Sequence, residues 1–219
     1  MTLPSSPACE RNKRPIAEVL KNYLVTPQRL DTTPPALLEI GSGTGEHAAY
    51  FASCFSAVTW QPSDVATNLP HIARRCAATQ LANLRTPIVL DLASPSWLPS
   101  NSAQPAMAAR YDFIFTANTL HIVSLTLVER LFEGCRRRLK PSGLLFVYGP
   151  FNYNGEYTSE SNRDFDHWLK ARDLHSGIRD IEKLAEFAAA TTPYLRLIQD
   201  FPMPSNCLLY TSDAADEFS

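Results

Sequence analysis

Apolar residues follow two different periods that alternate along this chain. Short apolar runs, such as Ala36–Ile40 and Phe113–Phe115, are typical of strands buried on both faces of a parallel sheet. Between them, apolar residues recur every three or four positions, as in the helix predicted at 15–24, which Pro27 closes. We expect strands at 36–40, 57–61, 88–92, 112–117, 144–148 and 195–199, and helices at 15–24, 46–52, 69–81, 125–139, 162–172 and 180–190.

This alternation predicts an α/β fold with right-handed crossovers, a Rossmann-like, doubly wound and mostly parallel sheet with helices on both faces. Pro62-Ser63-Asp64 is expected to be a turn, and 93–110 a loop. No repeat or linker divides the chain. We therefore expect one domain.

Composition narrows the class of protein. The net charge of −2 argues against a surface that tracks phosphates, so no nucleic-acid partner is expected. No apolar run is long enough to span a membrane, and residues 1–15 lack a signal-peptide core. Five cysteines with no C-x-x-C pair suit a reducing cytoplasm. No metal site is expected, and Arg136–Lys140 complement the negative end of a helix.

Three of the eight glycines, Gly41, Gly43 and Gly45, lie within five residues between a predicted strand and a predicted helix. This arrangement points backbone N–H groups and a positive helix end at a ligand. A dinucleotide fingerprint requires glycine where Glu46 stands, and no Lys-Ser or Lys-Thr pair of a phosphate loop follows. A dehydrogenase is therefore disfavoured.

The string Glu39-Ile40-Gly41-Ser42-Gly43-Thr44-Gly45 resembles the first motif of the seven-stranded S-adenosylmethionine-dependent methyltransferases, whose last strand is antiparallel. The resemblance implies that Glu39 attracts the ammonium group of this cofactor, that Asp64 accepts from its ribose and that Asp91 and Leu92 reach its adenine. The full implied cofactor set is Glu39, Gly41, Ser42, Gly43, Gly45, Asp64, Asp91, Leu92 and Asn118. As alternatives, Glu39 is a capping or paired acid, and Asp64 and Asp91 are turn residues.

The chain is also similar to the methyltransferase-like 26 family, or domain of unknown function 938, over residues 10–206. The strings that carry this similarity are Glu10–Ile16, Trp60–Asp64, Ala117–Ile122, Tyr148–Phe151, Ser161–Asp166, Ala171–Asp173, Gly177–Asp180 and Met203–Asn206. Residues 207–217 depart from the family pattern and resemble a translated sequencing adapter. We therefore expect a domain of residues 1–206 and a foreign tail at 207–219. Without the tail the seventh strand would be truncated, but the apolar residues at the start of the tail can still form it.

In this fold an acceptor lies over the carboxyl ends of the fourth and fifth strands. Asn118 is not followed by the Pro-Pro-aromatic string of amino-methylating nucleic-acid enzymes, and no cysteine follows a proline as in cytosine-C5 enzymes. His121 is the candidate general base; its alternative is a helix-start histidine that bonds backbone or lines the cofactor pocket. His47 either touches the cofactor or faces solvent.

Several polar residues after the fifth strand are candidates for the acceptor pocket. They are Tyr148, Tyr153, Asn162, Asp166, Arg172 and Arg179. As alternatives, they form a polar cap, and Arg172, Asp173, Arg179 and Asp180 pair with one another. Within residues 1–15, Glu10, Arg11 and Asn12 form either a lid over the cofactor or a disordered arm.

These features predict a methyltransferase that uses S-adenosylmethionine on a small-molecule acceptor, a protein acceptor remaining open. The alternative is a non-catalytic module that binds the cofactor and acts through protein partners. The oligomeric state stays open.

Overall fold

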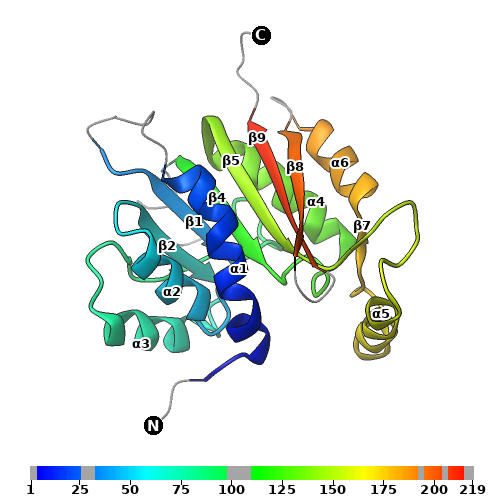
Figure 1. Ribbon diagram of the computed structural model, residues 1–219, viewed down its shortest axis with the longest axis horizontal. Helices are drawn as coiled ribbons and strands as arrows, with labels where there is room; N and C mark the ends of the chain where they lie inside the picture. Colours follow the sequence, from blue (N-terminus) through cyan, green and yellow to red (C-terminus); the bar gives the residue numbers. More distant parts are fainter. Residues whose placement is uncertain (1–3, 26–32, 98–109, 192–194, 204–206, 215–219) are drawn as a thin grey trace.

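The computed structural model describes residues 4–25, 33–97, 110–191, 195–203 and 207–214. Its elements, drawn in Figure 1, are α1 (Pro7–Leu24), β1 (Ala36–Ile40), α2 (Glu46–Cys54), β2 (Thr59–Asp64), α3 (Leu69–Thr79), β3 (Ile88–Val89), β4 (Tyr111–Ala117), α4 (Leu125–Arg138), β5 (Leu139–Gly149), β6 (Phe151–Asn152), α5 (Glu160–Arg172), β7 (Arg179–Asp180), α6 (Ile181–Ala189), β8 (Leu195–Met203) and β9 (Cys207–Ala214).

The central sheet has seven strands in the order β3-β2-β1-β4-β5-β9-β8. The five strands from β3 to β5 are parallel, while β9 runs antiparallel to both β5 and β8. The Rossmann-like, doubly wound fold and its antiparallel last strand are therefore confirmed. The strand order reverses between β1 and β4, and in such sheets ligands bind beyond the carboxyl ends of the strands at this point.

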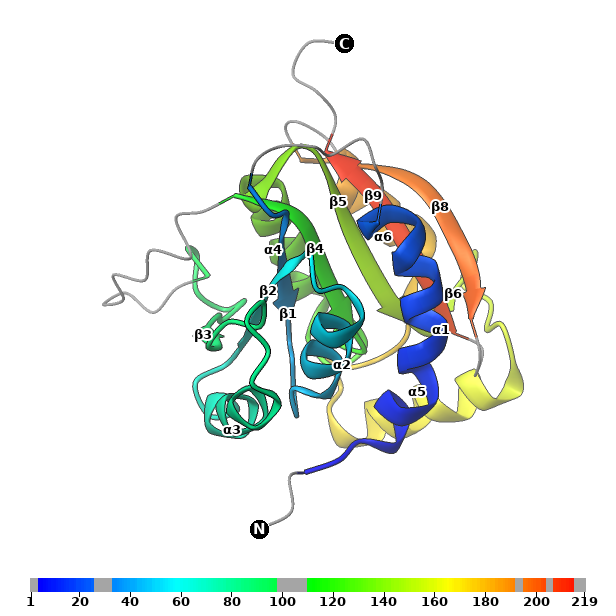
Figure 2. The same ribbon diagram turned by 60° about the vertical axis from the view of Figure 1, so that its left-hand side comes forward.

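Alternate residues of the central strands pack on opposite faces of the sheet. Leu37 and Phe113 belong to one buried cluster, which includes residues of α1 and α2. Leu38 and Ile114 belong to a second cluster, which includes residues of α4 and α6. Figures 1 and 2 show these helix pairs on the two sides of the sheet, with α3 beside α2.

The first helix is longer than predicted. It begins at Pro7 rather than Pro15, and the Ser6 side chain accepts from the backbone N–H of Cys9. Serine before a proline at the first helical position is a helix-start signal. Residues 7–14 are therefore neither a separate arm nor a loop, and Pro15 lies within the helix.

The turn predicted at Pro62-Ser63-Asp64 is wrong, and the fifth strand begins earlier than predicted. Pro62, Ser63 and Asp64 extend β2, because Pro62 and Ser63 pair with β1, and Ser63 and Asp64 pair with β3. Pro62 has no N–H to donate to a neighbouring strand. Beside it, Gln61 Nε2 donates to the Thr86 carbonyl at 2.8 Å. Residues 141–143 lie within β5, at the register shift opposite β4.

The third strand is shorter than predicted and ends at Val89. Of the expected loop at 93–110, only residues 93–97 and 110 are described. None of the described helices is both long and apolar enough to cross a membrane. That residues 207–219 are foreign stays a prediction, which resequencing of the locus tests.

Candidate functional site

A cavity of about 470 Å³ lies beyond the carboxyl ends of β1, β2 and β4, and we call it the glycine-loop cavity. Its size is typical of small-molecule sites. It is lined by Ser6, Cys9, Gly41, Ser42, Gly43, Thr44, Glu46, His47, Asp64, Val65, Asn68, Ala117, Asn118, Thr119, Ile122 and Val123.

The glycine loop is tied to the end of β2. The Ser42 N–H donates to the Ser63 carbonyl at 3.0 Å, and the Ser63 N–H donates to Ser42 Oγ at 3.2 Å. The Gly43 N–H donates to Asp64 Oδ2 at 2.7 Å. Extending β2 through Asp64 therefore fixes the loop that lines the cavity.

Two positions of this loop favour glycine for different structural reasons. Gly43 has φ +57°, and a Cβ there would meet nothing within 4 Å, so a side chain would enter open space at the cavity. Gly45 has φ +74°, and its Cβ would lie 3.3 Å from the backbone of Ile72 in α3. Gly43 leaves room for a ligand, whereas Gly45 allows helix packing.

Glu39 lies behind the loop rather than in the lining of the cavity. It is 2 % exposed, and its Oε2 accepts from Trp60 Nε1 at 2.6 Å. Burial raises its pKa to about 7, against the effect of the Trp60 hydrogen bond. A cation in the cavity would favour the ionised carboxylate.

The acids after β2 and β3 have different surroundings. Asp64 lines the cavity, and its Oδ1 accepts from the Val65 N–H at 2.7 Å and from Asn68 at 2.9 Å. Asp91 accepts from the Ala93 N–H at 2.9 Å, which is the turn contact given as its alternative. Neither Asp91 nor the buried Leu92 lines the cavity.

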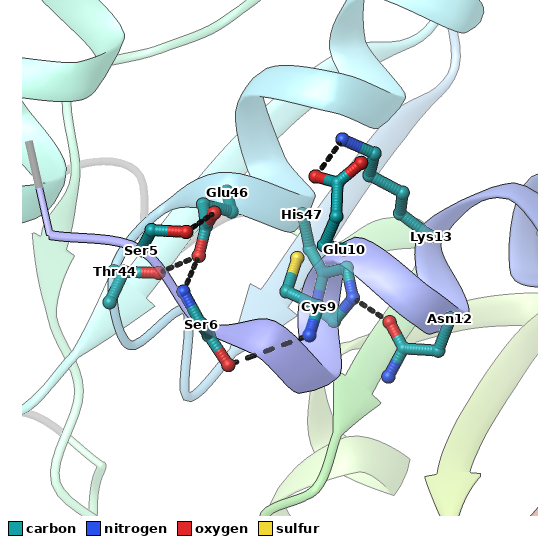
Figure 3. Close-up of polar contacts among 9 residues, drawn as sticks. All are labelled: Ser5, Ser6, Cys9, Glu10, Asn12, Lys13, Thr44, Glu46 and His47. Carbon is teal, nitrogen blue, oxygen red and sulfur yellow. Dashed lines mark hydrogen bonds and ion pairs between the residues drawn. The ribbon is translucent and has the colours of Figure 1, made fainter. Parts of the chain in front are cut away.

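The start of α1 forms one wall of the cavity and is anchored through Glu46 (Figure 3). The Glu46 carboxylate accepts from the Ser6 N–H at 2.6 Å, from Ser5 Oγ at 3.2 Å and from Thr44 Oγ1 at 2.9 Å. Arg75 donates to the carbonyls of both Thr44 and Pro4. Glu46, which replaces a fingerprint glycine, thus joins the N-terminal segment to the glycine loop.

His47 lines the cavity and does not simply face solvent. Its ring stacks on Phe51 at 5.3 Å between centroids, and its Nε2 lies 2.7 Å from Asn12 Oδ1. Burial lowers the pKa of His47 to about 4, so the ring is neutral near pH 7.

A second cavity of about 400 Å³ adjoins the first, and we call it the His121 cavity. It is lined by Ser6, Ala8, Arg11, Asn12, Asn118, His121, Tyr148, Pro150, Ser161, Asn162 and Phe165. Ser6 and Asn118 line both cavities. Asn118 has φ +56°, in the left-handed region that asparagine tolerates, and such residues cluster at functional sites.

His121 is 6 % exposed, and its ring lies 5.3 Å from that of Phe165 in a perpendicular contact. Burial and the Arg179 cation lower the pKa of His121 to about 4. Neither ring nitrogen has a hydrogen-bond partner among the described residues. The ring therefore does not bond backbone, and a neutral imidazole faces the second cavity.

The structure brings together only part of the predicted acceptor set. Tyr148 and Asn162 line the His121 cavity, whereas the other predicted members do not. Tyr153 donates to Asp200 at 2.5 Å, Asp166 accepts from Tyr157 at 2.7 Å and Arg172 lies over the Trp168 ring. These contacts are structural.

The ion pairs expected among Arg172, Asp173, Arg179 and Asp180 are replaced by other contacts. Arg179 donates to three backbone carbonyls, those of Leu120, Val123 and His175. Across the described ranges, no ion pair joins Arg172 or Arg179 to Asp173 or Asp180. Arg179 instead fixes the turn that carries His121.

Sequence reasoning missed most of the wall that α1 and α5 supply. Ser6, Cys9 and Phe165 were not singled out, and Arg11 and Asn12 were expected as a lid rather than as lining. Ser6-Pro7 carried a helix-start signal that would have placed the first two. Across the described ranges, no three His, Cys, Asp or Glu residues form a group that could hold a metal ion.

The model of the family described as "Protein of unknown function (DUF938)" matches residues 3–212. The chain belongs to this family. The DUF938 fold is similar to solved methyltransferases: an O-methyltransferase family protein from Burkholderia thailandensis has a TM-score of 0.74 at 13% identity, over 94% of this chain and 57% of that one. An O-methyltransferase family 2 protein from Planctomyces limnophilus, in complex with apigenin, has a TM-score of 0.73 at 16% identity, over 92% and 57%.

A putative sarcosine dimethylglycine methyltransferase from Galdieria sulphuraria has a TM-score of 0.68 at 16% identity, over 93% of this chain and 86% of that one. The DUF938 chain thus spans a little over half the length of the two O-methyltransferases. These similarities establish a methyltransferase-like fold.

Proposed function

We propose that this chain is a methyltransferase that transfers a methyl group from S-adenosylmethionine to a hydroxyl group of a small molecule. The observation that carries the proposal is the pair of adjoining cavities, which share Ser6 and Asn118. One contains the glycine loop, and the other contains a neutral imidazole without a hydrogen-bond partner among the described residues. The arrangement suits a donor and an acceptor that meet at Asn118.

The lining of the glycine-loop cavity fits this cofactor. Gly43 leaves space for it, and Asp64 has carboxylate oxygens at the same wall. Glu46 places a negative charge at the start of α2, where a phosphate would otherwise bind. S-adenosylmethionine carries a sulfonium cation and no phosphate, so this charge is compatible with it.

Held by the glycine loop and Asp64, the cofactor would supply a methyl group to the acceptor oxygen, and its sulfur would keep the electron pair of the broken bond. His121 would take the hydroxyl proton at an unpartnered ring nitrogen. Asn118 would position the acceptor at the junction of the cavities. Phe165 and Tyr148 would keep water away from it.

Binding of the cofactor can be tested by thermal shift with S-adenosylmethionine, S-adenosylhomocysteine and NAD. We expect both sulfur compounds to raise the melting temperature and NAD to leave it unchanged. Gly43→Asn should abolish the shift, because its side chain would enter the cavity and asparagine tolerates φ +57°. Gly155→Asn is the matched control, since Gly155 has φ +77° and open space but lies outside the cavity lining.

Equal shifts for Gly43→Asn and wild type would contradict the cofactor site. Turnover is tested by incubating the chain with a methyl-labelled donor and a pool of small metabolites. Cofactor binding without label transfer to any small molecule or protein would favour the non-catalytic module instead.

Two finer assignments belong to this proposal. Membership of the methyltransferase-like 26 family rests on the motifs from Glu10 to Asn206. A cytoplasmic location rests on the odd number of cysteines without a C-x-x-C pair.

A further inference from the structure

The His121 cavity has an electrostatic bias. Among the eleven described residues that line it, Arg11 is the one with a permanent charge, and none is an aspartate or glutamate. Arg11 forms no ion pair or hydrogen bond within the described part of the chain. The neighbouring Glu10 carboxylate is paired with Lys13 at 2.5 Å. The described lining of the cavity therefore contains one solvent-exposed cation and no carboxylate.

Asn12, the next residue of α1, adds a directed donor. It is 5 % exposed and lines the same cavity. Its Oδ1 faces His47 Nε2, and Figure 3 shows its amide nitrogen turned away from His47. This nitrogen has no partner among the described residues. Its N–H groups are therefore available to donate to a ligand oxygen in the cavity.

The other side of the cavity is aromatic. Phe165 contacts the His121 ring edge-on and stacks on Trp168 at 5.8 Å, while Tyr148 is 3 % exposed. Aromatic walls favour planar, apolar ligand groups. The cavity thus combines two adjacent donors from α1 with an aromatic wall from α5 and β5.

We propose that the acceptor is a small aromatic hydroxy acid. Its carboxylate binds Arg11 and Asn12, its ring lies against Phe165 and its hydroxyl faces His121 and Asn118. This inference rests on the proposed function and adds the substrate class.

Binding can be measured by calorimetry on the full chain saturated with S-adenosylhomocysteine. The probes are 2-, 3- and 4-hydroxybenzoate and the three matching hydroxybenzamides, which differ mainly in charge. We expect at least one benzoate to bind about tenfold or more tightly than its amide, the size of one charged hydrogen bond.

Arg11→Met should remove this preference without changing the affinity for S-adenosylhomocysteine. Arg14→Met removes the same charge from the exposed face of α1, outside the cavity lining, and should leave the preference intact. Asn12→Asp keeps an oxygen toward His47 but replaces the donor with a carboxylate oxygen, so it should weaken benzoate binding.

Three results would overturn the substrate class: no benzoate binds, benzoates and amides bind equally, or Arg11→Met and Arg14→Met behave alike. In each case S-adenosylhomocysteine would still bind, so the cofactor site would stand. Failure of the wild type to bind S-adenosylhomocysteine would overturn the proposed function and this inference with it.

Discussion

Asp64 contacts both the glycine loop and the cavity, whereas Asp91 contacts only its own turn. Asp64→Ala should weaken S-adenosylhomocysteine binding about tenfold to a hundredfold, because charged hydrogen bonds contribute roughly 1.5–3 kcal/mol. Asp91→Ala should change the affinity little. Calorimetry on both variants checks this, and a larger loss for Asp91→Ala would reverse the roles inferred from the geometry.

His121 should titrate far below an ordinary histidine because its ring is buried beside Arg179. NMR titration of the free protein should give a midpoint near pH 4, well below the ordinary histidine value of about 6.5. With an acceptor in hand, His121→Ala should lower the rate about 10²–10⁴-fold with little change in cofactor affinity. A His121 midpoint near 6.5 would contradict a buried neutral base at this position.

At the scale of elements, Glu46 holds the start of α1 against the glycine loop. Glu46→Ala should release this segment and weaken S-adenosylhomocysteine binding about tenfold, the loss of roughly one charged hydrogen bond. Hydrogen exchange over residues 4–10 should rise at the same time. Glu18→Ala, on the exposed face of α1, is the control and should change neither quantity.

The sheet could be predicted from the sequence because its central strands are short apolar runs. Such runs can be recognised as buried strands from the local sequence pattern alone. Pro62-Ser63-Asp64 could not, since turn-forming residues are held extended there by pairing with β1 and β3. The glycine loop was predictable from spacing alone. The His121 cavity was not, because α1 and α5 meet it from distant parts of the chain and no local signal joins Arg11 to Phe165.

For the whole molecule, three buried groups have pKa values that are shifted across the range from pH 4.5 to 6.5. The pKa values of His47 and His121 fall from 6.5 to about 4, so the unfolded state binds more protons between these values and stability falls as pH falls. The pKa of Glu39 rises from 4.5 to about 7, so its contribution falls as pH rises. The two histidines together outweigh Glu39, so the free energy of unfolding should rise with pH from 4.5 to 6.5, by on the order of 1 kcal/mol per pH unit.

Urea denaturation across this range should therefore show the greatest stability near pH 6.5. His121→Gln should make the curve nearly flat from pH 4.5 to 6.5, because His47 and Glu39 then oppose each other one to one. A wild-type protein that is more stable at pH 4.5 than at pH 6.5 would contradict the burial of the two histidines.

The Glu46 carboxylate should also affect which adenosine-containing compounds bind in the glycine-loop cavity. The N-terminus of a helix ordinarily attracts phosphate. At the N-terminus of α2, however, the Glu46 carboxylate already supplies a negative charge and accepts hydrogen bonds from three donors. ATP and NAD would bring their phosphates against a fixed negative charge. A phosphate-free adenosine compound would then bind in preference to nucleotides. Selectivity would arise from repulsion between Glu46 and phosphate as much as from the fit of the ligand.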